Sequence, residues 1–347
     1  MKKVKFGIVG TGAIAKLHAE ALRLTNNAEL YIVYDTVPER AAAFAQKHNC
    51  MTASTLEELL VSEVEAVTIA TPSGFHADVA IPAAKAGKHI LCEKPLDVTV
   101  SKTNDMVRAC ESSNVRLSAV FQSRFLHSVQ TIKKAVDAGR FGEPVLAAAS
   151  VRWYRNPEYY ASAVWRGTWV LDGGGALMNQ GIHTVDLLLY LNGDVSDVTG
   201  RTARLLHKSI EVEDTVVAML KFKNNSLGTI EASTACSPGF PQRIELSGTR
   251  GSVMLEDDRI IRWSFVDEHS EDEEIRRVCG LGEGLRGGSS DPRAISAEGH
   301  GRQIAELAEA ILNGHGLTTP GSEGKRAVEL ICAVYESART GTTIKFL

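Results

Sequence analysis

Apolar runs alternate with helix-like patterns over the first third of the chain. Five runs that are apolar throughout lie at residues 4–9, 30–34, 66–70, 89–92 and 116–121, with segments of helical periodicity between them. Strands of this kind are typical of a parallel sheet that helices cover on both faces. Because βαβ crossovers are right-handed, the pattern predicts an α/β, doubly wound domain over residues 1–122.

The rest of the chain, residues 123–347, has a different pattern. A strand-like run at 144–153, an aromatic-rich loop and a helix at 176–191 come first, and further strand-like runs follow at 198–206, 216–222, 228–235, 243–247, 252–256 and 260–265. Short connections between such runs are typical of hairpins. The pattern predicts a second α/β domain with a largely antiparallel sheet, a long loop at 267–298, and long helices at 301–313 and 322–340.

Composition narrows the classes of partner. The chain has 347 residues, a net charge of −4 and no basic stripe, so nucleic acid is not expected as a partner. No apolar segment approaches the roughly 20 residues that cross a bilayer, so no membrane association is expected. The six cysteines form no Cys-x-x-Cys pair, which favours a reducing cytoplasm over a disulfide framework or a structural zinc site.

A glycine loop follows the first strand directly and opens a helix. In Gly10-x-Gly12-x-x-Ala15 the first glycine permits a tight turn, and the second lets a pyrophosphate approach the backbone. Asp35 ends the second strand 25 residues after Gly10, where a carboxylate accepts hydrogen bonds from a ribose diol. The alternative is a structural glycine turn, and Arg40 keeps NADP open as a cofactor. The pattern favours NAD, bound by Gly10, Thr11, Gly12, Ala13, Ile14, Asp35 and Arg40.

Lys94 closes the apolar run in "HILCEKPLDV". Ligands of doubly wound sheets bind outside the carboxyl ends of the strands, so Lys94 is expected at the cofactor crevice rather than in an ordinary surface turn. There the positive nicotinamide ring and partial burial would lower its pKa and make it a proton carrier. A cis peptide before Pro95 would fix the direction of the lysine side chain.

A second polar set lies in "GGGALMNQGIHTVDLLLYL". Read as a helix, this segment puts Asn179, His183 and Asp186 on one face. The alternative is a solvated polar face, but the glycine triplet predicts a helix start that packs closely against another element. No third ligand stands at a suitable spacing from the histidine and the aspartate, so no metal site is expected.

These motifs resemble those of the Gfo/Idh/MocA oxidoreductases, the family of glucose-fructose oxidoreductase and inositol 2-dehydrogenase. The resemblance is carried by the glycine loop, "TPSGFHADVAIPAAKAGKHILCEKPL", the GGGALMNQ segment and "GKRAVELICAVYESARTG". It implies an N-terminal Rossmann domain and a C-terminal substrate-binding α/β domain, whose open, mainly antiparallel sheet joins subunits into homodimers or homotetramers. It also implies an NAD(P)-dependent dehydrogenase that transfers a hydride between nicotinamide and a secondary alcohol or ketone of a sugar, glycoside or cyclitol.

The resemblance also implies roles for individual residues. The lysine and histidine of the family fall on Lys94 and His183. Inositol-type members have an aspartate where Asn179 stands, and an amide cannot take up a proton. Lys94 and His183 would therefore share the proton transfer, while Asn179 binds a substrate hydroxyl. Further cofactor contacts are implied at Thr71, Pro72, His76, Glu93, Lys94, Gln122, Trp165 and Arg166, and further substrate contacts at Arg124 and Tyr154.

Several alternatives stay open at this point. Arg124 could instead make a structural ion pair, and the Trp165-Arg166 pair could anchor its loop. A neutral sugar or glycoside is the favoured substrate, with aromatic residues 153, 154, 159 and 160 stacking on a pyranose face. The arginines at 152, 155 and 166 leave an anionic substrate open. A reductase of a dehydro-sugar, an NAD-dependent glycosidase and a cofactor-sensing regulator are the rival functions.

Overall fold

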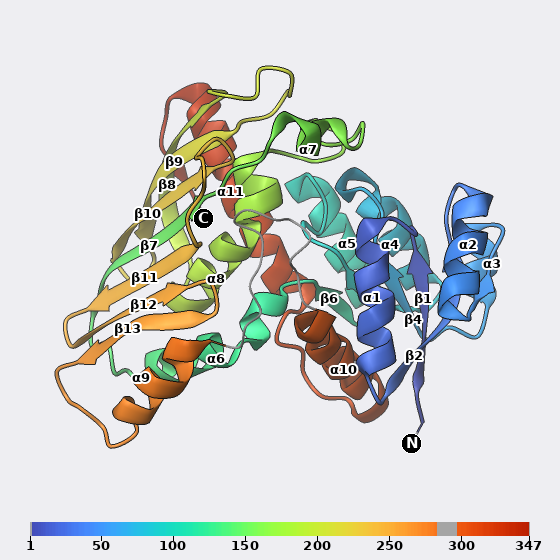
Figure 1. Cartoon of the computed structure of the whole chain (residues 1–347), viewed down its shortest axis with the longest axis horizontal. Helices are drawn as coiled ribbons and strands as arrows, with labels where there is room; N and C mark the ends of the chain where they lie inside the picture. The colour runs from blue at the N-terminus through green and yellow to red at the C-terminus, as the bar shows by residue number, and fades with distance from the viewer. Residues whose placement is uncertain (1, 283–296, 347) are drawn as a thin grey trace. The chain divides into compact units, whose positions relative to one another are not determined.

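The computed structural model describes residues 2–282 and 297–346 (Figure 1). The chain forms two compact units, one from Met1–Gln122 and Ser296–Val328 and the other from Ser123–Ile295 and Glu329–Leu347. The sequence pattern predicts residues 296–328 in the second domain, whereas the structure places them in the first unit. The reason is that helix α10 (Ala297–Asn313) completes the first core, where Ile304 and Leu307 lie in one buried cluster with Phe6 and Ile8.

The first unit is built on a six-stranded parallel sheet in the order β3-β2-β1-β4-β5-β6. The order reverses between β1 and β4, which is where doubly wound sheets bind ligands. The predicted doubly wound sheet is confirmed. Its elements are β1 (Val4–Val9), α1 (Ala13–Leu24), β2 (Ala28–Tyr34), α2 (Pro38–His48), β3 (Met51–Thr52), α3 (Leu56–Val61), β4 (Ala66–Ile69), η1 (Ser73–Phe75), α4 (His76–Lys85), β5 (His89–Cys92), α5 (Val100–Ser112), β6 (Leu117–Ala119) and α10.

The second unit contains an eight-stranded sheet in the order β13-β12-β11-β7-β10-β9-β8-β14. All neighbours are antiparallel except β7 and β10, so the predicted, largely antiparallel sheet is confirmed. The strands are β7 (Pro144–Arg152), β8 (Val195–Ala203), β9 (Thr215–Phe222), β10 (Leu227–Ser233), β11 (Arg243–Gly248), β12 (Gly251–Glu256), β13 (Arg259–Phe265) and β14 (Ile344–Lys345). The helices are α6 (His127–Asp137), α7 (Pro157–Ala161), α8 (Ile182–Asn192) and α9 (Asp272–Leu281). Two further elements, η2 (Gln122–Phe125) and α11 (Gly321–Thr340), have residues in both units.

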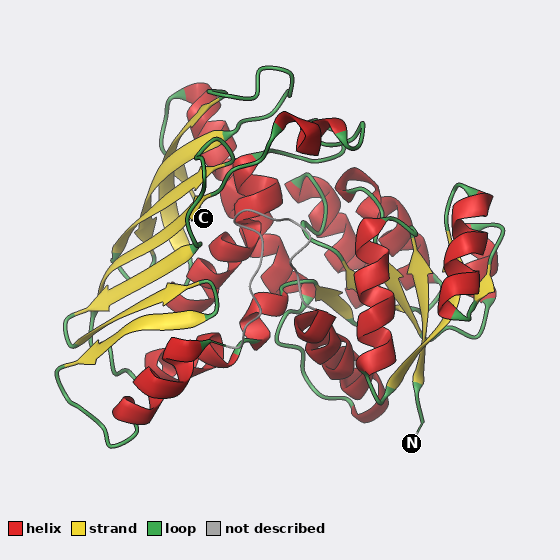
Figure 2. Ribbon diagram, viewed as in Figure 1, coloured by secondary structure: helices red, strands yellow, loops and turns green. Residues whose placement is uncertain are grey.

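The two faces of the second sheet differ. Figure 2 shows helices along one face, including α8 and α11 as labelled in Figure 1. Along β9 the side chains of Val216, Ala218 and Leu220 are buried, whereas Val217 and Met219 are 52% and 63% exposed. This alternation follows from the two-residue period of a strand, which places successive side chains on opposite faces.

Two local predictions differ from the structure. The predicted loop at 267–298 contains helix α9, whose first turn is acidic and whose buried Asp272 accepts hydrogen bonds from Arg140 and from the Trp263 indole. Residues 283–296 of that segment lie outside the described residues. The predicted helix at 176–191 begins with a π-helical turn, Ala176–Gly181, before α8. Among the described helices, none has the length and apolar character that crossing a membrane requires.

Candidate active site

The glycine loop between β1 and α1 has the geometry of an anion-binding turn. Gly10 has φ +88, and a Cβ there would lie 2.8 Å from the carbonyl oxygen of Ala70, so only glycine fits. At Gly12 a Cβ would meet no described heavy atom within 4 Å. Helix α1 begins at Ala13 without a side-chain cap. No capping side chain therefore accepts hydrogen bonds from the N–H groups of its first turn, which includes Ile14. A pyrophosphate can therefore approach this turn.

Asp35 is fixed against the same loop. Its Oδ2 accepts hydrogen bonds from the Thr11 N–H and hydroxyl, both at 2.8 Å, and its Oδ1 accepts from the Val37 N–H at 2.9 Å. Burial opposes ionisation, but these donors and Arg40, 3.6 Å away, hold the pKa of Asp35 below its usual value. Three hydrogen bonds leave the carboxylate some acceptor capacity. Asp35 is thus an ionised group that can still receive a hydroxyl.

The loops after β4 and β5 are tied together by His76. Its ring lies buried, with Nδ1 2.8 Å from the carbonyl oxygen of Pro95 and Nε2 3.0 Å from that of Thr71. Burial lowers the pKa of His76, so the ring is neutral at pH 7 and donates to one of the two carbonyls. The ring therefore holds the half-buried Pro72 loop beside the Lys94-Pro95 peptide, which is cis. His76 acts within the protein to fix these strand ends.

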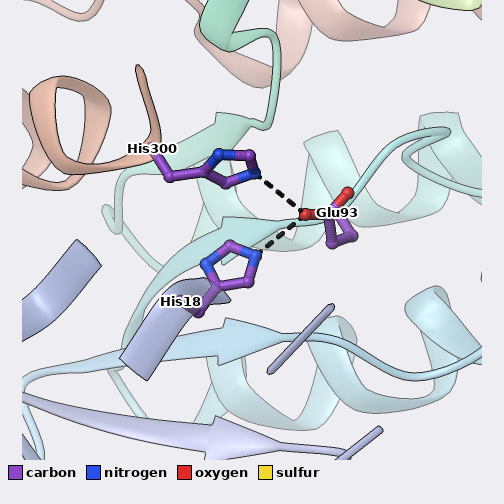
Figure 3. Close-up of side chains that lie close together, drawn as sticks. All are labelled: His18, Glu93 and His300. Atoms are coloured by element: carbon purple, nitrogen blue, oxygen red, sulfur yellow. Dashed lines mark hydrogen bonds and ion pairs between the residues drawn. The ribbon is translucent and has the colours of Figure 1, made fainter. Parts of the chain in front are cut away.

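Lys94 itself is half-buried just beyond the end of β5. Its backbone N–H donates to Oε2 of Glu93 at 3.1 Å. The other oxygen of Glu93 lies near two buried histidines, His18 and His300 (Figure 3). The Glu93 side chain thus contacts protein groups on both of its oxygens, a position that the resemblance alone did not predict.

In the second unit a polar network surrounds Tyr159. The Tyr159 hydroxyl accepts hydrogen bonds from Arg166 Nη1 at 2.6 Å and from Gln180 Nε2 at 2.7 Å. Gln180 also donates to Asn179 Oδ1 at 2.8 Å and accepts from Arg155 Nη2 at 2.9 Å. Burial raises the pKa of Tyr159, so the hydroxyl keeps its proton at neutral pH. The predicted residues Asn179 and Arg166 therefore belong to one hydrogen-bonded network.

The start of the Asn179 segment is held by a buried carboxylate. Glu213 accepts hydrogen bonds from the N–H groups of Gly175 and Leu177 and from the Tyr335 hydroxyl, each at 2.9 Å. A Cβ at Gly175 would lie 1.8 Å from the Glu213 carbonyl oxygen, and one at Gly174 would lie 2.2 Å from the Tyr335 hydroxyl. The prediction of a closely packed helix start after the glycine triplet is confirmed.

Asp186 and Arg124 form a buried ion pair. Arg124 Nε donates to Asp186 Oδ2 at 2.8 Å, and Nη2 donates to Oδ1 at 2.6 Å. Both side chains are 1% exposed, whereas Asn179 and His183 are half-buried. Arg124 thus makes a structural ion pair, the alternative considered for it from the sequence. Asp186 is buried in this pair and does not share the partly accessible face of Asn179 and His183.

The remaining predicted residues occupy half-buried positions. Tyr154 makes an isolated β-bridge with Ala235, and Gln122 begins η2. Arg166 lies over the Trp165 ring at 4.7 Å, so this pair has the contact expected of a loop anchor. Lys94 and the glycine loop belong to the first unit, and Asn179, His183 and the Trp165-Arg166 pair to the second.

Six residues of these clusters were not singled out in the sequence: His18, Asp172, Gln180, Glu213, His300 and Tyr335. Asp172 is buried, accepts from the Gly167 N–H at 2.8 Å and also accepts a hydrogen bond from the Asn179 amide. Helical or strand periodicity indicates which face of an element is buried but not which side chains meet there, so it marks none of these positions. The one usable signal was proximity in sequence, since Gln180 adjoins Asn179.

Comparison with known proteins gives matches over most of the chain. Residues 4–121 match the model of an oxidoreductase family with an NAD-binding Rossmann fold, and residues 129–254 match the GFO/IDH/MocA C-terminal domain. Inositol 2-dehydrogenase of Rhizobium meliloti is 30% identical over 260 residues, which cover 74% of this chain and 76% of that protein. The 2,7-anhydro-N-acetylneuraminate hydratase of Escherichia coli is 29% identical over 259 residues, covering 73% and 68%.

A solved structure is similar over the whole chain. The WlbA dehydrogenase from Bordetella pertussis, in complex with NADH and UDP-GlcNAcA, superposes with a TM-score of 0.90 at 34% identity and covers 100% of this chain and 98% of its own. Together with the two family matches, this confirms the predicted fold, the NAD cofactor and the oxidoreductase class. The chain therefore belongs to the Gfo/Idh/MocA family of NAD-dependent oxidoreductases.

Proposed function

We propose that this enzyme is an NAD-dependent dehydrogenase that oxidises a secondary hydroxyl of an acidic, nucleotide-linked sugar. The observation that carries the proposal is a pair of arginines sharing one aromatic ring. The guanidinium carbons of Arg166 and Arg155 lie 4.3 Å and 5.5 Å from the centre of the Tyr159 ring. Two like charges held this close favour an anionic ligand between or beside them.

The charge balance around Arg166 supports the same class of substrate. Within the described part of the chain, Arg166 makes its hydrogen bond to the neutral Tyr159 hydroxyl and has no ion pair with a carboxylate. A half-buried guanidinium without a carboxylate partner is costly, and an acidic ligand would offset that cost. The similarity to a dehydrogenase solved with UDP-GlcNAcA points the same way. This differs from the neutral sugar that the sequence favoured.

The residues present fit the cofactor, and different residues would bind its phosphates and ribose and accept the proton. Gly10, Thr11, Gly12 and the first turn of α1 would hold the pyrophosphate, and Asp35 the adenosine ribose. Bound NAD⁺ supplies the hydride acceptor. As the hydroxyl carbon of the sugar loses its hydrogen as hydride, the hydroxyl proton passes to Lys94 or His183, which leaves a ketone. Asn179, fixed by Gln180, positions a neighbouring hydroxyl.

The proposal is tested by NADH production from matched substrates. UDP-GlcNAcA and UDP-GlcNAc differ by one carboxylate, and we expect turnover with the first and a KM at least ~10-fold higher with the second. Arg166→Gln should remove most of that difference, whereas Arg201→Gln, which changes an exposed arginine of the same unit, should leave it. Equal turnover of both sugars by the wild type would contradict the acidic class. Sugar release from an aryl glycoside without net NADH would instead support the glycosidase alternative.

We further propose that subunits associate through the outer face of the second sheet, as homodimers or homotetramers in the cytoplasm. Val217, Met219, Leu146 and Leu227 are each at least 50% exposed on β7, β9 and β10. An exposed apolar set of this kind is typical of an interaction surface. None of the six cysteines forms a disulfide, in line with a reducing compartment. Light scattering of wild type and Met219→Glu should show a larger mass for the wild type.

A further inference from the structure

Three buried side chains from distant segments meet behind the Lys94 strand end. His18 from α1, Glu93 at the end of β5 and His300 from α10 are 0%, 6% and 2% exposed. Figure 3 shows the two rings pointing at the same carboxylate oxygen. His18 Nε2 lies 2.8 Å and His300 Nε2 3.5 Å from Glu93 Oε1. All three residues belong to the first unit.

The hydrogen bonds of the cluster fix where its protons lie. Nδ1 of His18 and Nδ1 of His300 are buried and have no hydrogen-bond partner among the described residues. A proton on either Nδ1 would therefore be a buried donor without an acceptor, which is unfavourable. Both rings are thus neutral, with the proton on Nε2, and both donate toward Glu93.

The electrostatics agree with this assignment. Burial lowers the pKa of His18, which keeps its ring neutral. Burial alone would raise the pKa of Glu93, but the two histidine donors hold it well below its usual value. The cluster therefore carries one net negative charge on the Glu93 carboxylate.

The same geometry argues against a metal ion, although the three ligand atoms lie within 4.8 Å of one another. Ligands about 2.1 Å from a tetrahedral zinc stand about 3.4 Å apart, whereas His18 Nε2 and Glu93 Oε1 are at hydrogen-bond distance, 2.8 Å. Metal binding through Nε2 would also move both protons to Nδ1. Histidine ligands almost always donate that proton to a partner, and none is present among the described residues.

The carboxylate connects this cluster to Lys94. Glu93 Oε1 faces the histidines, while Oε2 accepts the Lys94 backbone N–H at 3.1 Å. We propose that His18, Glu93 and His300 are positioning residues for hydride transfer, because the neutral rings hold an anion that orients Lys94 and keeps a negative charge beside it. The proposal rests on the assignment of Lys94 as a proton carrier.

The test compares two substitutions of His18 in the full-length chain. The amide N–H of His18→Gln can replace the Nε2 donor, whereas His18→Leu removes it. With NAD⁺ and UDP-GlcNAcA we expect His18→Leu to lower kcat ~10- to 100-fold, with KM and NAD affinity within about threefold of wild type. His18→Gln should stay within about threefold in kcat, as should His315→Leu, an exposed histidine of the same unit. Equal losses in both His18 variants, or none in His18→Leu, would overturn the proposal.

A second measurement does not depend on the substrate. Acetic anhydride labelling of Lys94, followed by mass spectrometry over a pH series with bound NAD⁺, reports the proton affinity of its amine. Removing the anion with Glu93→Gln should lower that affinity ~10-fold, and His18→Gln should not change it. An unchanged affinity in Glu93→Gln would refute the charge coupling even if Lys94 proves essential for turnover. If the wild type contained one zinc ion per chain and His18→Leu contained none, the cluster would be a metal site and the proposal would be overturned.

Discussion

The ion pair between Arg124 and Asp186 allows a quantitative test, because its role could be structural or substrate-binding. Both side chains are 1% exposed, and two charged hydrogen bonds of 2.8 Å and 2.6 Å join them. Arg124→Met leaves the Asp186 carboxylate buried without its cation. Removing one partner of a buried pair costs about 3–5 kcal/mol, and we expect a loss of this size.

The double substitution Arg124→Met/Asp186→Leu separates pairing from burial. It removes both charges and leaves apolar groups of similar volume, which is often close to neutral for stability. We therefore expect the double variant to be more stable than either single variant, with a coupling energy of about 3 kcal/mol or more. Arg201→Met, an exposed arginine in β8, should change stability by no more than about 0.5 kcal/mol.

Tryptophan fluorescence in urea measures this loss in the second unit alone. All four tryptophans belong to that unit: Trp153, Trp165, Trp169 and Trp263. With a slope of about 2 kcal/mol per molar urea, a 4 kcal/mol loss lowers the midpoint by about 2 M. An Arg124→Met variant with the wild-type urea midpoint but without turnover of UDP-GlcNAcA would refute the structural role. It would indicate instead that Arg124 contacts the substrate.

Further predictions concern the proton carrier, the cofactor loop and one buried acid. Lys94→Ala should abolish turnover and leave NADH binding by fluorescence within about threefold, while Lys85→Ala, an exposed lysine on α4, should retain turnover. Gly10→Ala should weaken NAD binding at least ~100-fold by calorimetry, because its Cβ would lie 2.8 Å from a backbone oxygen at φ +88. Asp35→Ser should shift kcat/KM toward NADP by ~10-fold or more, since it removes the charge that opposes a 2′-phosphate. Burial raises the pKa of Glu213 to about 7. The second unit should therefore lose stability as the pH rises from about 5 to about 8, and Glu213→Gln should flatten that change in urea midpoints.

Local signals in the sequence were sufficient for the architecture of the first unit. The apolar strands, the helical segments between them and the glycine loop each depend on residues within about 15 positions of one another, as periodicity and turn conformation require. Lys94 could be placed at a strand end for the same reason. Family membership followed from motifs that are continuous in the chain, and the comparisons confirmed it.

Contacts between distant segments decided the rest. Arg124 pairs with Asp186, which is 62 residues away in the sequence, and His18 contacts Glu93, which is 75 residues away. Segment 296–328 belongs to the first core because Ile304 and Leu307 are buried in it, although the segment follows strands β7 to β13 of the second sheet in the chain. Such pairings depend on which faces become buried together, and no periodic pattern encodes a partner. The sequence by itself thus determined most elements of the first unit and the cofactor class, because these depend on local patterns. The tertiary structure alone decided which charges are paired and which are buried, because that depends on contacts between distant segments.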